Sequence, residues 1–197
     1  MKRRTFIKKN AIVTLAPFIT TGLLARNKKI KSLSEKPFQL NYAPHFGMFE
    51  SMAGKDLMDQ IQFMHDQGFR SLEDNGMKNR SKKTQNDIAK KMEKLGMSMG
   101  VFVGHNIYWK EPNLTSGDKS LQDEFVENIR DSVEVAKRVN ATWMTIVPGH
   151  IDLKKEMDYQ TANVIEALKR AAEILEKHNL VMVLEPLNWW SNHAGQY

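Results

Sequence analysis

The carboxylate of Glu185 stands where a parallel β-sheet most often presents reactive groups. It directly follows the apolar run Leu180–Leu184 and opens the segment Glu-Pro-Leu-Asn, which ends at Asn188. Short apolar runs of this kind are typical of strands buried on both faces, and the residue after such a strand lies at the carboxyl edge of the sheet. Glu185 is therefore the first candidate for a catalytic or metal-binding group.

Other polar and ionisable side chains follow the remaining apolar runs. They are His45, Glu73 with Asp74, His105 with Asn106, and His150 with Asp152. If these runs are parallel strands, their ends meet at one rim, where histidine and carboxylate side chains could bind a divalent ion or a polar substrate. Asn188 and Trp109, in the loop after His105, are further candidates for substrate contact.

Each candidate also has a structural alternative. Glu185 could be the buried partner of a Lys or Arg, although burying a charged group that has no functional role costs free energy. Glu73 lies in the turn Leu-Glu-Asp-Asn-Gly, where acids also cap helices and fix turns. The histidines could hold loops by hydrogen bonds, and Trp109 could pack beneath its loop.

Strand-like and helical patterns alternate through the rest of the chain. Apolar residues at helical spacing predict helices, and short apolar runs predict strands. The predicted strands are 38–43, 69–72, 97–103, 143–147 and 180–184, and the predicted helices are 55–67, 84–95, 121–139 and 161–178. This alternation is typical of a parallel sheet with helices on the outside.

The alternation favours an α/β fold of the (β/α)8 TIM barrel type over a doubly wound nucleotide-binding sheet. No Gly-x-Gly-x-x-Gly segment follows the first predicted strand, and no phosphate-binding loop occurs. A full barrel takes about 250 residues. Residues 37–197 hold the first four βα units and a fifth strand, so we expect the N-terminal part of a barrel. A half barrel that pairs with a second copy is the alternative.

Residues 1–36 are predicted to be a twin-arginine-type export signal and a connector. Residues 1–31 hold nine Lys and Arg and no acid, and Arg3-Arg4 precedes the apolar stretch 11–25. A basic amphipathic tail is the alternative. We therefore expect a periplasmic protein that meets the membrane only through export of this leader.

The charge of the remaining residues argues against a nucleic-acid partner. The whole chain carries a net charge of +6, but residues 32–197 hold 20 basic and 23 acidic side chains, a net of −3. The chain has no cysteine, so a bound metal would have oxygen and nitrogen ligands. We expect a small-molecule ligand, and homo-oligomerisation stays open.

Five segments together resemble the xylose isomerase-like sugar isomerase/epimerase barrels, and most closely their hydroxypyruvate isomerase branch. The likeness spans residues 37–197. It implies that Glu185 binds a divalent metal, Mn²⁺ or Mg²⁺, and takes part in proton transfer, while Glu73 and His105 contact the substrate. The segments are Tyr42-Ala-Pro-His-Phe-Gly47, Leu72-Glu-Asp-Asn75, Gly100-Val-Phe-Val-Gly-His105, Val147-Pro-Gly-His150 and Leu184-Glu-Pro-Leu-Asn188.

The resemblance implies isomerisation or epimerisation of a small ketose or hydroxypyruvate-like substrate through an enediolate. In that family the other metal ligands come from strands six to eight. They are therefore expected beyond residue 197, and the 197-residue chain alone is expected to be inactive. The loop after Glu185 carries Trp189-Trp190 where the family often has an Arg-containing group, which leaves the substrate open. A non-catalytic periplasmic sugar-binding protein is the alternative, and the net charge of −3 disfavours a barrel endonuclease.

Overall fold

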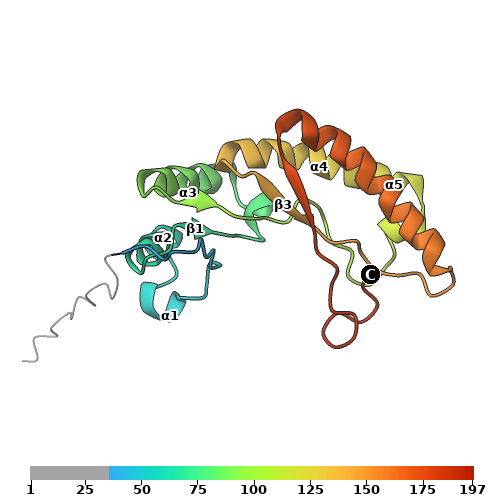
Figure 1. Ribbon diagram of the computed structural model, residues 1–197, viewed down its shortest axis with the longest axis horizontal. Helices are drawn as coiled ribbons and strands as arrows, with labels where there is room; N and C mark the ends of the chain where they lie inside the picture. The colour runs from blue at the N-terminus through green and yellow to red at the C-terminus, as the bar shows by residue number, and fades with distance from the viewer. Residues whose placement is uncertain (1–35) are drawn as a thin grey trace, which may run out of the picture. The chain divides into compact units, whose positions relative to one another are not determined.

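The computed structural model describes residues 36–197, so the predicted export signal lies outside the described residues. In the described part, short strands alternate with helices along the chain (Figure 1). The strands are β1 (Ser71–Leu72), β2 (Ser98–Met99), β3 (Trp143–Ile146) and β4 (Val181–Leu184). The helices are α1 (Glu50–Ala53), α2 (Leu57–Asp66), α3 (Lys82–Lys94), α4 (Lys119–Val139) and α5 (Met157–Leu175), with 3₁₀ turns η2 (Met77–Asn79), η3 (Leu114–Ser116) and η4 (Glu176–His178).

The strand pairings are parallel and follow the order of the chain. β1 pairs with β2, and β3 pairs with β4 in a register that sets Ile146 opposite Leu184. A parallel bridge between Val103 and Thr145 connects the two pairs. The carboxyl ends of the strands therefore lie along one rim, with a helix between successive strands, which is the arrangement of a TIM barrel.

Local sequence signals fix the helix that covers β2 and β3. The Asp118 carboxylate caps the start of α4 by accepting a hydrogen bond from Ser120 N at 2.7 Å. Asn140 ends the helix in the left-handed conformation, at φ 53°. Between these caps, residues at helical spacing are buried, so α4 presents one apolar face to the sheet. Figure 1 shows α3, α4 and α5 in a row along one side of the strands.

The hydrophobic core lies between the strands and these helices. Leu72, Phe102, Met144 and Ile146 of the sheet side are fully buried, and Ile129 of α4 is fully buried against them in the same cluster. The apolar alternation of the sequence therefore produces one continuous core beneath the rim.

The strand predicted at residues 38–43 does not form, which corrects the sequence analysis. Pairing with β1 comes instead from the residues just after it, through a parallel bridge between His45 and Glu73 and a hydrogen bond from Glu73 N to Pro44 O at 3.2 Å. Phe38, Leu40 and Tyr42 are 45%, 65% and 53% exposed. The segment lies beside β1 on one flank, and its exposed side chains give it little apolar burial to stabilise an extended ladder.

Helix positions agree with the predictions, but their ends differ. α5 begins at Met157, four residues before the predicted start. Gln160 explains the early start, because its side chain accepts from Asp152 N at 2.7 Å and donates to Asp152 O and Lys155 O, which ties the preceding loop to the first turn. Within residues 36–197, the helices lack the length and apolar character needed to cross a membrane.

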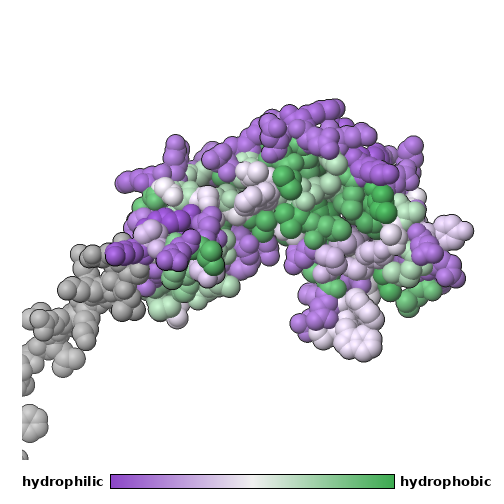
Figure 2. Space-filling model, viewed as in Figure 1, coloured by the Kyte–Doolittle hydropathy of each residue, from purple (hydrophilic) through white to green (hydrophobic). Residues whose placement is uncertain are grey.

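β4 has an apolar surface that the described residues leave open. Val181, Val183 and Leu184 are 47%, 41% and 47% exposed, although the sequence pattern is that of a strand buried on both faces. Figure 2 shows hydrophobic surface around β4 and the adjoining side of α5, while the outer surface of the helices is mostly hydrophilic. An uncovered apolar edge strand is a site for further strand or helix packing.

Shortening the buried Ile129 should destabilise this core. Ile129→Ala is expected to lower the free energy of unfolding by about 2 to 5 kcal/mol, because it leaves a cavity against the sheet. The matched change Ile165→Ala, at a side chain that is 46% exposed on α5, should cost less than about 1 kcal/mol. Urea unfolding followed by circular dichroism measures both, and equal losses would contradict the assigned core.

Candidate functional site

A pocket of about 590 Å³ opens at the carboxyl ends of β2, β3 and β4, and Glu185 is part of its wall. We call it the Glu185 pocket. It is lined by Asn75, Gly76, Lys78, Asn79, Val103, His105, Asn106, Ile107, Trp109, Val147, Glu185, Leu187 and His193. A cavity of this size and mixed polarity is suited to a small polar molecule.

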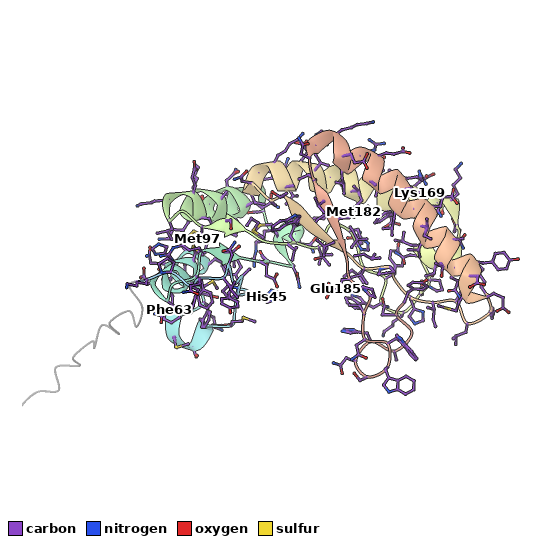
Figure 3. All side chains as sticks on the ribbon, viewed as in Figure 1. His45, Phe63, Met97, Lys169, Met182 and Glu185 are labelled. Atoms are coloured by element: carbon purple, nitrogen blue, oxygen red, sulfur yellow. The ribbon has the colours of Figure 1, made fainter. Side chains whose placement is uncertain are left out.

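Strand pairing places Glu185 at the rim. Its backbone N donates to Ile146 O at 2.9 Å, which extends the β3–β4 ladder by one step. Figure 3 shows Glu185 just beyond the end of β4. Its side chain is exposed and makes no hydrogen bond or ion pair with another described residue. The structural alternative of a buried ion pair is therefore wrong, and the carboxylate is available to a ligand.

His105 forms part of the pocket floor and is 4% exposed. Its Nε2 accepts a hydrogen bond from Val147 N at 3.0 Å, and its ring meets Phe125 edge-on. Burial lowers the pKa of His105 from 6.5 to about 4, an effect that a hydrogen bond with the Asn106 backbone opposes and the charge of Lys78 reinforces. His105 is therefore a neutral ring that ties the end of β3 to the preceding strand segment.

Lys78 is a pocket residue that the sequence analysis missed. Its Nζ donates to Asn128 O at 2.7 Å, to Asn128 Oδ1 at 3.0 Å and to Gly104 O at 3.3 Å. Burial lowers the pKa of Lys78 from its usual value, and Asp131 raises it. Nothing local in the sequence indicates this role, since its acceptors lie 26 and 50 positions away.

An aromatic pair stands at the mouth of the pocket. The rings of Trp109 and His193 stack with centroids 5.6 Å apart, and both side chains line the cavity. Gln196 holds the Trp109 loop by donating to the carbonyls of Tyr108 and Trp109, each at 3.1 Å. Trp109 thus lies in the same pocket as Glu185, and His193 is a second residue that the predicted set did not include.

His45 and Glu73 lie together but outside the wall of the Glu185 pocket. His45 Nε2 lies 2.6 Å from Glu73 Oε1, across the bridge that joins the first segment to β1. The neighbouring Asp74 is instead buried and bound by Arg80, whose Nε lies 2.5 Å from Asp74 Oδ2. The predicted role of His45 and Glu73 in substrate contact stays a prediction.

His150 and Asn188 hold backbone and do not line the Glu185 pocket. His150 Nδ1 lies 2.8 Å from Ile151 O, and its ring packs against Gly195. Asn188 Oδ1 accepts from Trp190 N and Ser191 N, both at 3.2 Å, and so forms the turn after β4. The contact of His150 matches its structural alternative of holding a loop. The predicted contact of His150 and Asn188 with substrate stays a prediction.

The described residues do not complete a metal site. Glu185 is the carboxylate of the pocket wall, and residues 36–197 contain no group of three or more His, Cys, Asp or Glu side chains that could hold a metal ion. Glu185 offers one oxygen ligand, whereas a protein site for Mn²⁺ or Mg²⁺ usually draws on several. Within residues 36–197 the Glu185 pocket therefore does not supply a complete ligand set for the expected Mn²⁺ or Mg²⁺.

With the rim and its carboxylate in place, a comparison with protein families gives a match. The model of the xylose isomerase-like TIM barrel family aligns with residues 61–196, which includes β1 to β4 and Glu185. The chain belongs to the xylose isomerase-like TIM barrel family. The predicted fold class is thereby confirmed, and the hydroxypyruvate isomerase branch within the family stays a prediction.

Solved structures with the same fold include two named as sugar epimerases. The D-psicose 3-epimerase of Clostridium cellulolyticum H10 is 18% identical, with a TM-score of 0.60 and coverage of 78% of this chain and 55% of that protein. The 3-keto-D-glucoside 4-epimerase of E. coli is 13% identical, with a TM-score of 0.61 and coverage of 79% and 59%. A family 2 AP endonuclease of Brucella melitensis is 17% identical, with a TM-score of 0.60 and coverage of 78% and 57%.

The chain spans little more than half the length of these three family members, between 55% and 59%. The comparison with curated proteins found no match. At identities below 20%, the solved structures establish the fold of the xylose isomerase-like barrel for this chain. Its reaction must be argued from the pocket.

The buried, neutral His105 should make stability depend on pH. Because its pKa falls from 6.5 to about 4 on folding, the unfolded chain binds the extra proton between these values. The stabilisation is complete above pH 6.5 and is lost as the pH falls to about 4, a loss of about 3 kcal/mol.

Urea unfolding of the parent chain and of His105→Gln at pH 7, 5.5 and 4.5 tests this dependence. The difference in unfolding free energy between the two proteins should shrink as the pH falls. A difference that is constant over this range would contradict the assignment.

Proposed function

We propose that this chain carries the proton-transferring part of a sugar isomerase or epimerase, with Glu185 as its catalytic base. The observation that carries the proposal is the Glu185 carboxylate, which pairs with no other residue of 36–197 and is held by the β3–β4 ladder at the rim where barrel enzymes bind substrate. Membership of the xylose isomerase-like family and the names of the two epimerases support it.

The chemistry follows from the position of this carboxylate. A Glu185 oxygen would accept the proton of a carbon next to a carbonyl, and the electron pair of the broken C–H bond would form an enediolate. Protonation of the neighbouring carbon gives isomerisation. Protonation of the same carbon from the opposite face, by a second acid, gives epimerisation. The aromatic wall of Trp109 and His193 would exclude water from this intermediate.

The finer features of the proposal rest on the resemblance. A small ketose or a hydroxypyruvate-like molecule would be the substrate, and a divalent ion, Mn²⁺ or Mg²⁺, would polarise the carbonyl when bound. Glu185 would supply one of its ligands, and the others are expected beyond residue 197. The twin-arginine pattern of residues 1–36 supports export to the periplasm.

Removing the Glu185 carboxylate should abolish most of the activity. In the natural full-length protein supplied with Mn²⁺, Glu185→Gln is expected to lower kcat about 10²- to 10⁴-fold on the ketohexose or hydroxypyruvate substrate that it turns over. Glu173→Gln, which removes an exposed carboxylate from α5, serves as the matched control and should keep full activity.

Turnover is measured by chromatography of the sugar products, and substrate affinity by calorimetry. Full activity of Glu185→Gln would contradict the catalytic assignment. Tight binding of a sugar by a parent protein that converts none of the substrates would instead indicate the alternative, a sugar-binding protein.

A further inference from the structure

The Glu185 pocket contains a half-buried cation that no carboxylate within the described residues neutralises by direct contact. All the acceptors of Lys78 Nζ are neutral amide or carbonyl oxygens, at 2.7, 3.0 and 3.3 Å. Asp131 interacts with it electrostatically and raises its pKa, but no ion pair within 4.0 Å joins the two side chains among the described residues. A hydrogen-bonded but uncompensated charge at low exposure attracts an anion.

The side chains on the outer side of Lys78, away from the Glu185 pocket, do not fully neutralise its charge. Lys78 also lines a second hollow, on the outer side between η2, α3 and α4. Asp131 and Glu134 face that hollow, and Glu134 is already paired with Lys137 at 2.7 Å. The remaining lining side chains there are Arg80, Lys82, Gln85, Val135 and Arg138, and Arg80 is paired with Asp74. Asp131 therefore faces two further cations of this hollow, Lys82 and Arg138, besides Lys78.

The wall around Lys78 can also donate hydrogen bonds. Asn75 precedes the η2 turn that carries Lys78, Asn79 is the last residue of that turn, and Asn106 follows His105; all three are exposed and line the Glu185 pocket. Amide groups of this kind donate to carboxylate or phosphate oxygens. The burial that lowers the pKa of His105 keeps that ring neutral, so it neither adds to nor competes with the charge of Lys78.

The positive and negative groups of the Glu185 pocket therefore lie on different sides of it. A cation and three amides lie on the side of η2 and the segment after β2, whereas the carboxylate of Glu185 lies at the end of β4. An anionic group would be attracted by Lys78 and repelled by Glu185, so these two charges fix which end of a substrate lies where.

We propose that Lys78 makes the Glu185 pocket selective for substrates with an oxyanion, a carboxylate or phosphate, at the end of the molecule away from the reacting carbonyl. This inference rests on the proposed function and narrows it to anionic sugars and hydroxy-keto acids. Because its three donors are used on Gly104 and Asn128, Lys78 acts through its charge, while the neighbouring amides contact the anion.

Three six-carbon ligands test the proposal at matched size. D-fructose is neutral, 5-keto-D-gluconate carries a carboxylate, and D-fructose 6-phosphate carries a phosphate. Calorimetric titration of the natural full-length protein with each ligand should give at least tenfold tighter binding of one or both anions than of D-fructose, and the preferred anion distinguishes the two sources of charge.

Substitution at Lys78 separates a charge effect from a structural one. Lys78→Met should reduce the preference for the anion to less than threefold and leave the affinity for D-fructose within twofold, because it removes charge from the wall. Lys78→Arg should retain a preference. Lys169→Met removes an equal charge from the exposed surface of α5 (Figure 3) and should leave the preference unchanged.

A measurement on the parent chain covers the case in which Lys78→Met does not fold. Raising NaCl from low to high concentration should weaken binding of the anion and leave that of D-fructose unchanged. Equal affinities for all three ligands, no binding of either anion, or a preference that survives Lys78→Met would overturn the proposal. Binding of an anion that depends on Lys78, together with no turnover by the natural full-length protein supplied with Mn²⁺, would contradict the proposed function and leave this inference standing.

Discussion

The parallel pairing of β3 with β4 determines where the groups of the pocket can lie. Its last step, from Glu185 N to Ile146 O at 2.9 Å, holds the first residue beyond β4 at the level of Val147 and His105. Because side chains alternate along strands, a shift of one residue in this register would move the carboxylate away from the pocket. The core beneath the rim therefore serves chemistry as well as stability, since it keeps this register fixed.

The ionisable groups at this rim differ in charge and burial, and therefore in the roles they can have. Glu185 is exposed to solvent and can act as a base. His105 is buried and neutral and holds the backbone of Val147 by a hydrogen bond. Lys78 is a cation whose hydrogen-bond acceptors are neutral oxygens. Each state follows from the surroundings of the group. Burial lowers the pKa of both His105 and Lys78, and the charge of Asp131 opposes this effect at Lys78. The arrangement favours one orientation of a substrate that carries both a carbonyl and a negative charge.

The sequence predicts the features that depend on local pattern. The apolar runs at 143–147 and 180–184 and the helical spacing of 121–139 correspond to β3, β4 and α4, and the carboxylate after the last strand lies in the pocket. It does not predict what depends on distant partners, such as the contact of Lys78 with Asn128, 50 positions away. The segment 38–43 does not form the predicted strand, because an apolar pattern alone does not supply a neighbouring strand to pair with. The side chains of Phe38, Leu40 and Tyr42 stay exposed.

The central claim is that Glu185 moves a proton between a carbon atom and itself. The most direct measurement is turnover of a ketose or hydroxy-keto acid by the natural full-length protein in D₂O, followed by mass spectrometry of product and remaining substrate. Incorporation of deuterium at the carbon next to the carbonyl, lost in Glu185→Gln, is the predicted result. Product that forms without deuterium and at an unchanged rate in Glu185→Gln would contradict the account, because hydrogen would then reach the product without the Glu185 carboxylate.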